Sequence, residues 1–140
     1  KFHPGGSLSI KLRTVADLMI VGKNIPFISE NTKMKVALKI ITKKGLGVLV
    51  VRNKRNITSG IITDGDIKRL AQKYDNFNNF KIKSIMKKNP VCVNENMLAS
   101  QALYIMNKKR ITSLCVYKEG KKNKTIGIIH IHNILNANIN

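Results

Sequence analysis

Acidic residues are scarce in this sequence. Seven Asp and Glu stand against 26 Lys and Arg, so the formal net charge is +19 at pH 7. Such a charge can attract nucleic acid or anionic lipid, but the densest lysine groups, at residues 81–88 and 118–124, lie in segments that we predict to be linker or turn. Tryptophan is absent and only 3 Tyr and 4 Phe occur, so no aromatic stacking platform accompanies the cations. We therefore expect no specific nucleic-acid partner, and a basic nucleic-acid-binding module stays open as an alternative function.

Long apolar runs are also missing, and cysteines are few. No stretch approaches the ~20 apolar residues that span a bilayer, and no signal-peptide pattern opens the chain, so we expect no membrane partner. The two cysteines, Cys92 and Cys115, each lie within a short apolar run. This favours buried structural thiols over a disulfide framework and indicates a reducing, cytoplasmic compartment. Because the chain opens on Lys1 rather than Met, we expect it to be part of a longer protein.

A duplicated unit accounts for most of the chain. Three short motifs recur in the same order at offsets of 65 to 67 residues, namely 15–19 with 82–86, 36–38 with 101–103, and Gly-Ile-Ile at 60–62 with 127–129. Anchors in a constant order, with offsets that differ by two residues, indicate two copies of one unit with small loop insertions.

Each copy shows the apolar patterns of strands and helices in the order β-α-β-β-α. Met34, Ala37, Leu38 and Ile41, for example, follow the i, i+3, i+4, i+7 spacing of an amphipathic helix. The predicted elements are extended segments at 25–28 and 90–93, helices at 32–43 and 97–108, strands at 46–51, 57–63, 112–117 and 125–130, and helices that begin near Asp64 and Ile131. One copy alone buries little surface, so we expect an α/β (α+β) fold in which the copies pack with pseudo-twofold symmetry.

Two further predictions concern the first helix of each copy. Asn31 and Asn96 precede these helices and are predicted to be N-caps, because an Asn side chain can accept a hydrogen bond from the first turn. The methionines at positions 34, 97 and 106 lie on apolar helix faces and are predicted to be core residues.

The order of elements, together with Gly-Ile-Ile-Thr-Asp-Gly-Asp-Ile at residues 60–67, resembles the CBS domain in its paired arrangement. The resemblance covers the chain from about Val15 to Leu135. It implies a ligand cleft between the two copies, in which Thr63 and Asp66 hold the ribose and phosphate region of a nucleotide. Asn133 stands where the family usually has Asp, so the second copy lacks that carboxylate.

The two ends of the chain resemble one group of CBS proteins more closely. His-Pro-Gly-Gly-Ser-Leu at residues 3–8 and Gly-Ile-Ile-His-Ile-His-Asn at 127–133 are similar to arabinose 5-phosphate isomerases, which interconvert ribulose 5-phosphate and arabinose 5-phosphate for the Kdo sugar of lipopolysaccharide. His3 resembles a histidine implicated in that catalysis. No residue set here supplies the base and the electrophilic help that an isomerisation needs, so we expect this chain not to be an enzyme.

The resemblance divides the chain into four segments. They are the tail of a sugar isomerase domain with its linker at 1–14, the first CBS repeat at 15–73, a linker at 74–81, and the second repeat at 82–140.

Nine residues are predicted to contact the ligand: Thr63, Asp64, Asp66, Arg110, Thr112, Ser113, His130, His132 and Asn133. The Thr63–Asp66 pattern is also a capping box, which a plain helix start would explain. His130 and His132 would share one face of a strand, and they are predicted to line the cleft rather than bind a metal, which needs further ligands.

We therefore expect a regulatory binding module. Its ligand would be a small anionic metabolite, either a nucleotide or a nucleotide-activated sugar of the CMP-Kdo type, and it would need no cofactor. The resemblance implies a homodimer through the CBS pair and a tetramer in the parent protein. A purely structural oligomerisation module is the other alternative.

Overall fold

The structure is a computed structural model that describes residues 12–139. The predictions for residues 1–11, including the one for His3, lie outside the described residues. Within the described range, no helix is long and apolar enough to cross a membrane. The chain divides into two compact units. We call residues 23–90 the central unit, and residues 12–22 with 91–139 the terminal unit.

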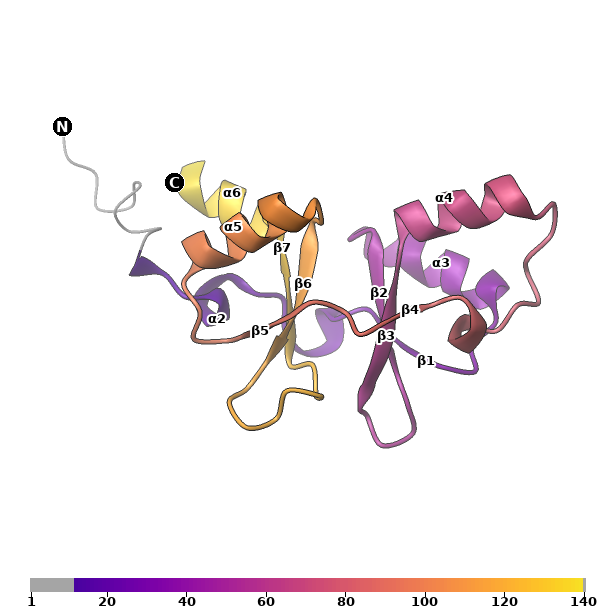
Figure 1. Cartoon of the computed structure of the whole chain (residues 1–140), viewed down its shortest axis with the longest axis horizontal. Helices are drawn as coiled ribbons and strands as arrows, with labels where there is room; N and C mark the ends of the chain where they lie inside the picture. The colour runs from indigo at the N-terminus through magenta and orange to yellow at the C-terminus, as the bar shows by residue number, and fades with distance from the viewer. Residues whose placement is uncertain (1–11, 140) are drawn as a thin grey trace. The chain divides into compact units, whose positions relative to one another are not determined.

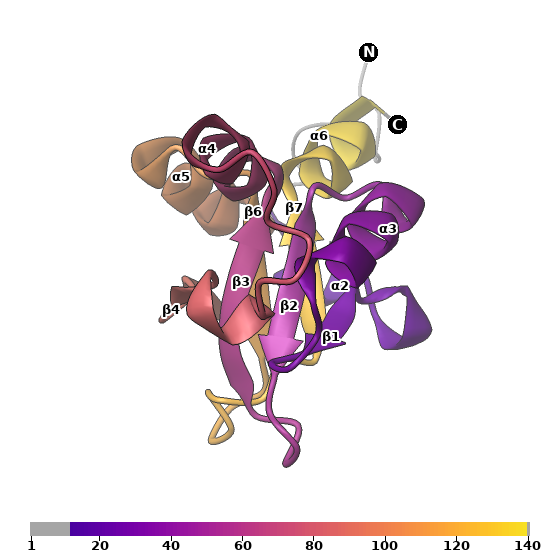
Figure 2. The ribbon, with the colours of Figure 1, turned by 90° about the vertical axis from the view of Figure 1, so that its right-hand side faces the viewer.

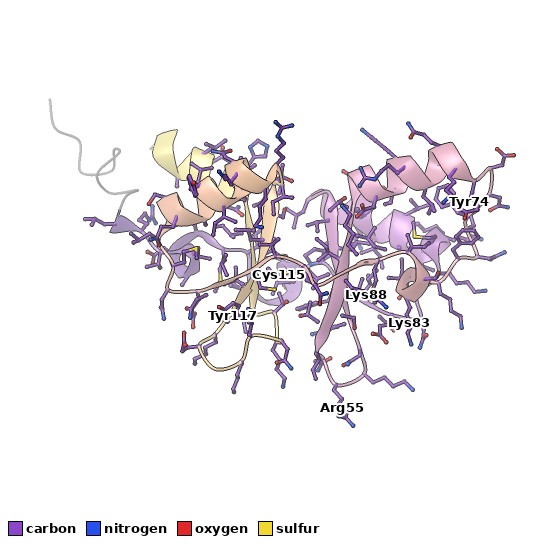
Figure 3. The ribbon with its side chains drawn as sticks, in the orientation of Figure 1. Arg55, Tyr74, Lys83, Lys88, Cys115 and Tyr117 are labelled. Atoms are coloured by element: carbon purple, nitrogen blue, oxygen red, sulfur yellow. The ribbon has the colours of Figure 1, made fainter. Side chains whose placement is uncertain are left out.

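The central unit is a four-stranded sheet with helices on one face (Figures 1 and 2). Its elements are η1 (Gly22–Asn24, at its boundary), β1 (Phe27–Ser29), α3 (Met34–Lys44), β2 (Val48–Arg52), β3 (Thr58–Thr63), α4 (Asp64–Lys73), η2 (Ile82–Ser84) and β4 (Lys87–Lys88). The strand order is β1-β2-β3-β4, with β1 parallel to β2 and the other neighbours antiparallel. Arg55 lies in the hairpin turn between β2 and β3 (Figure 3).

The terminal unit repeats this arrangement with a three-stranded sheet in the order β5-β6-β7. Its elements are α2 (Val15–Leu18), β5 (Cys92–Asn94), α5 (Ala99–Lys109), β6 (Ser113–Tyr117), β7 (Gly127–His130) and α6 (Ile131–Ile139). Strand β5 is parallel to β6, and β7 is antiparallel to it. The predicted β-α-β-β-α order is thus confirmed in both copies, and the predicted strands at 46–51 and 112–117 become β2 and β6, each paired with the preceding and the following strand of its own copy.

The two compact units do not coincide with the two sequence repeats. The leading segment of the first repeat packs in the terminal unit, and the leading segment of the second repeat packs in the central unit. The leading residues 12–22 belong to the terminal unit, and residues 82–90, which open the second repeat, belong to the central unit. Ile20 pairs with Ile128 of β7, and Lys87 of β4 pairs with Ile61 of β3. Ile20 and Lys87 are 67 residues apart, and so are their partners Ile61 and Ile128. Each copy therefore exchanges its leading segment in the same way.

Gly60 and Gly127, the first residues of the two Gly-Ile-Ile motifs, permit this exchange. A Cβ atom on Gly60 would overlap the carbonyl oxygen of Lys87, and a Cβ atom on Gly127 would press against the Met19 thioether and lie 3.1 Å from the carbonyl oxygen of Ile20. Glycine within a strand commonly marks such a close backbone approach. The recurring glycine is therefore a packing requirement of the exchanged segment.

Each unit has its own apolar core between its sheet and its helices. The fully buried side chains include Met34, Leu49 and Ile62 in the central unit, and Met106, Leu114 and Ile129 in the terminal unit. The exchanged segments contribute Ile82 and Val15 respectively, both at 0% exposure. The core positions predicted for Met34 and Met106 are confirmed, and Met97 packs at the edge of the terminal core.

The N-cap predictions for Asn31 and Asn96 are wrong. Helices α3 and α5 each begin two residues later than predicted, after Lys33 and Leu98, and neither of these N-cap residues makes a side-chain capping bond. Backbone carbonyls distant in sequence receive the first N–H groups instead. Met34 donates to Phe80 at 2.8 Å, and Ala99 donates to Arg13 at 2.8 Å. The exchanged segments thus satisfy the helix donors that an Asn side chain would otherwise cap.

Candidate functional site

The start of α4 carries three of the predicted ligand residues. The N–H of Thr63 donates to Asp66 Oδ2 at 2.9 Å, and the N–H of Asp66 donates to Thr63 Oγ1 at 3.2 Å. These reciprocal bonds are the predicted capping box, so that reading of the motif is confirmed. Asp64 opens the helix, and its N–H donates to the carbonyl oxygen of Gly47 at 3.0 Å.

The Asp66 carboxylate is fully engaged by the protein. Its Oδ1 accepts a bond from Arg69 Nη2 at 2.6 Å and lies 3.3 Å from Lys87 Nζ, while the residue is 9% exposed. Burial acts to raise the pKa of Asp66, but hydrogen bonds from Thr63 and Arg69 and the charge of Lys87 outweigh it, and the pKa lies below its ordinary value of 3.8. Asp66 is therefore ionised near neutral pH and bound to two cations of its own unit.

An open hollow of about 480 Å³ lies beside Asp66 in the central unit. It is lined by Asp66, Arg69, Leu70, Lys73, Tyr74, Phe80, Ser84, Ile85 and Lys87. The Tyr74 and Phe80 rings meet edge to face with centroids 5.0 Å apart, and Figure 3 shows Tyr74 at the end of α4. Cationic side chains beside an aromatic wall suit a small molecule that carries both an anionic group and an apolar ring.

The start of α6 in the terminal unit has the same backbone geometry with different side chains. The N–H of His130 donates to Asn133 Oδ1 at 2.8 Å, as Thr63 does to Asp66. The N–H of Ile131 donates to the carbonyl oxygen of Thr112 at 2.8 Å, as Asp64 does to Gly47. His130 and Asn133 thus occupy the positions of Thr63 and Asp66, and the side chain that accepts this N–H is a neutral amide.

His130 and His132 lie together, although not on one strand as predicted. His130 ends β7 and His132 lies in the first turn of α6, where their rings stack with centroids 5.0 Å apart. The N–H of His132 donates to His130 Nδ1 at 3.1 Å. Burial and the neighbouring charge of His132 lower the pKa of His130 below its ordinary value of 6.5. The pair therefore favours an uncharged imidazole at His130, which can accept a hydrogen bond.

Ser113 is directly opposite His130 in the antiparallel register of β6 and β7. Among the described residues, its hydroxyl is the buried side-chain oxygen for which no hydrogen-bond partner is found. Leaving such a group unpaired costs about 1–3 kcal/mol. The same position in the central unit is Val48, which is opposite Thr63, so the hydroxyl is not needed by the fold.

Arg110 caps the end of α5 with φ 55° and ψ 45°, the left-handed conformation. Gly45 holds the equivalent place in the central unit with φ 70°. Left-handed backbone costs about 1–2 kcal/mol for a residue with a Cβ atom. Arg110 thus occupies a backbone position at which glycine would be less strained.

The structure therefore brings the predicted residues together as two sets. Thr63, Asp64 and Asp66 share the start of α4, and the terminal unit gathers Thr112, Ser113, His130, His132 and Asn133, with Arg110 at the entry to the same strand. Two neighbours of Asp66 were missed. Arg69 could have been found from its i, i+3 spacing, whereas Lys87 comes from the exchanged segment.

Comparison with known proteins identifies the family. The CBS domain model matches residues 15–73 and 82–140. The chain belongs to the CBS-domain family. As a CBS pair it is 36% identical over 138 residues to arabinose 5-phosphate isomerase KdsD of Yersinia pestis and to protein RP505 of Rickettsia prowazekii. These alignments cover 98% and 99% of the chain but 41% and 42% of the two relatives, so the chain spans about two fifths of their length.

Solved structures show the same CBS-pair fold. CBSX2 in complex with AMP aligns with a TM-score of 0.79 and 21% identity, over 90% of this chain and 96% of that one. The CBS domain pair of MJ0100, in complex with 5′-methylthioadenosine and S-adenosyl-L-methionine, aligns with a TM-score of 0.74 and 25% identity, over 89% and 94%. The predicted fold class is therefore confirmed.

Proposed function

We propose that this CBS pair is the regulatory part of an arabinose 5-phosphate isomerase and that it is not itself a catalyst. The observation that carries this proposal is the 36% identity to KdsD of Yersinia pestis across 98% of the chain. The parent protein would interconvert ribulose 5-phosphate and arabinose 5-phosphate in Kdo biosynthesis, in the cytoplasm. The CBS pair would bind a nucleotide or a nucleotide-activated sugar and bias the attached isomerase domain.

The central unit supports an anionic ligand of this class. Arg69, Lys73 and Lys87 line the hollow beside Asp66, and two of them are bound to its carboxylate. A ligand phosphate would compete with Asp66 for these cations, and the released carboxylate oxygen could then accept bonds from ribose hydroxyls. Ligand binding would exchange one set of ion pairs for another. A preference for one arrangement of the CBS pair would couple the ligand to the isomerase by about 1–3 kcal/mol.

The test is a thermal-shift screen followed by calorimetry with AMP, S-adenosylmethionine and CMP-Kdo. We expect one of them to raise the melting temperature of the chain, with a stabilisation that grows with the logarithm of its concentration and reaches about 2.7 kcal/mol at a hundredfold excess over Kd. Asp66→Ala should weaken that ligand more than Asn133→Ala, because a carboxylate forms charge-assisted bonds and an amide does not. Equal affinity for Asp66→Ala and the unsubstituted chain would reduce the motif to a helix cap.

Two alternatives are outcomes of the same measurements. A shift with DNA or RNA that weakens steeply with salt would favour a basic nucleic-acid binder. The absence of any response, with a stable dimer by light scattering, would favour a structural oligomerisation module. The homodimer, the tetramer of the parent and the twofold packing of the copies stay predictions.

A further inference from the structure

Cys92 and Cys115 face each other across neighbouring strands of the terminal unit. They are Cα partners in the parallel register of β5 and β6, and their thiols are hydrogen-bonded to each other. Neighbouring strands lie about 4.8 Å apart, which is inside the range of about 4.4–6.8 Å that a disulfide spans between Cα atoms. The register of the two strands therefore meets the Cα distance requirement of a disulfide.

The two thiols have unequal surroundings. Cys92 lies on β5, an edge strand of the sheet, and is partly exposed, whereas Cys115 on the central strand β6 is 3% exposed. The hydrogen bond from Cys115 outweighs burial and, with the charge of Lys122, lowers the pKa of Cys92 to about 7. The same hydrogen bond and burial raise the pKa of Cys115 above its ordinary value. At neutral pH Cys92 is the nucleophile of the pair.

The fold does not require cysteine at these positions. In the central unit the equivalent Cα partners of β1 and β2 are Phe27 and Val50, which are related to Cys92 and Cys115 by the 65-residue offset. An ordinary apolar pair serves the same pairing there. Neither thiol belongs to the proposed ligand contacts, so a separate role is open to the pair.

We propose that Cys92 and Cys115 are a peroxide-responsive thiol pair, with Cys92 as the attacking and Cys115 as the resolving cysteine. The Cys92 thiolate attacks one oxygen of hydrogen peroxide; the S–O bond forms, the O–O bond breaks and hydroxide leaves. The Cys115 sulfur then attacks the Cys92 sulfenic acid. The S–S bond forms, the S–O bond breaks, and water leaves with the Cys115 proton. In total the two thiols lose two electrons, and one peroxide becomes two waters.

The test is to treat the reduced chain with hydrogen peroxide at pH 7, alkylate the remaining thiols and measure the intact mass. We expect the unsubstituted chain to lose two hydrogens, to take up no alkylating agent and to return to the dithiol with dithiothreitol, with the bond mapped between the peptides of Cys92 and Cys115. Cys92→Ser should consume peroxide at least about tenfold more slowly, since an ordinary thiol is only a few per cent ionised at pH 7.

Cys115→Val is the matched variant, because Val50 is the equivalent residue in the central unit. Its Cys92 should stop at the sulfenic acid, which dimedone labels, and should react more slowly because the hydrogen bond from Cys115 is gone. Two alkylated thiols after peroxide, overoxidation of Cys92 in the unsubstituted chain, or a disulfide only between chains would overturn the proposal. The mapping on the unsubstituted chain decides the matter even if a variant fails to fold.

Discussion

The helix starts of α4 and α6 have the same backbone hydrogen bonds and different electrostatics. In the central unit the side chain that accepts the N–H of the N-cap residue is a carboxylate, Asp66, bound to Arg69 and Lys87. In the terminal unit it is an amide, Asn133, beside two stacked imidazoles. The cap requires only an oxygen that accepts an N–H, so its charge is free to vary. The duplicated geometry therefore serves the fold, and the two units differ in the charge of the groups at these helix starts.

The largest loss of stability should come from substituting Gly60, against which the exchanged segment packs closely. Gly60→Ala places a Cβ atom against the backbone of Lys87, whereas Gly127→Ala mainly meets the flexible side chain of Met19. We expect Gly60→Ala to lower the free energy of unfolding by about 2–3 kcal/mol and Gly127→Ala by about 1 kcal/mol. Urea titrations would measure both. Equal costs would mean that the two exchanged segments are held with equal rigidity.

The next effect concerns the two caps. Asp66→Ala should lower the free energy of unfolding by about 1–2 kcal/mol, because the N–H of Thr63 loses its acceptor. Asn133→Ala should lower it by about 1 kcal/mol for the equivalent reason. The ion pairs add little, since Arg69 and Lys87 are largely exposed. The folded-state pKa of Asp66 is lowered, so its contribution is present above pH ~4 and is lost as the pH falls through the folded value. Asp66→Asn should keep the cap and remove that acid dependence of the melting temperature.

Ser113 offers a smaller effect of opposite sign. Its buried hydroxyl lacks a partner and Val48 occupies the equivalent position, so Ser113→Ala should raise the free energy of unfolding by about 1 kcal/mol. Chemical denaturation would measure the gain, with Val48→Ala as the control that loses only apolar packing. If Ser113→Ala is destabilising, the hydroxyl has a partner in solution, and ligand titration of the variant would show whether that partner is the ligand.

The smallest effect is a pH dependence confined to the terminal unit. The folded-state pKa of His130 is lowered, so the folded chain resists protonation there; stability is complete above pH ~6.5 and falls as the pH drops through the folded value. The ring is partly exposed, so we expect less than about 1 kcal/mol. Melting curves between pH 5 and 7.5 should flatten in His130→Gln, whereas Thr63→Val should leave their slope unchanged.

The sequence was sufficient for the elements inside each copy, because apolar periodicity and the Gly-Ile-Ile motif occur twice. It was insufficient for the leading segments. Residues 15–18 and 82–84 form short helical turns, too short for a periodic signal. The pairing of Ile20 with β7 and of Lys87 and Lys88 with β3 depends on tertiary contacts. The wrong N-caps have the same origin, since the carbonyls of Phe80 and Arg13 lie two residues before those helical turns.

The candidate site was predictable where it is local. The Thr63–Asp66 box follows from a three-residue spacing, and the grouping of Ser113 with His130 follows from the strand order. The contact of Lys87 with Asp66 joins residues that only the exchange brings together. The stacking of His130 on His132 depends on the turn from strand to helix, which an extended strand would not produce.

The exchange of leading segments has a consequence for the newly made chain. The central unit uses the uninterrupted residues 23–90 and can close while synthesis continues, but the terminal unit needs residues 127–130 to pair with Ile20, which is made much earlier. At about 5–20 residues per second, the ~100 residues between them take roughly 5–20 s to emerge from the ribosome. During that interval Val15 and Ile20 have no sheet to cover them, and this short apolar stretch stays accessible to solvent until β7 is made.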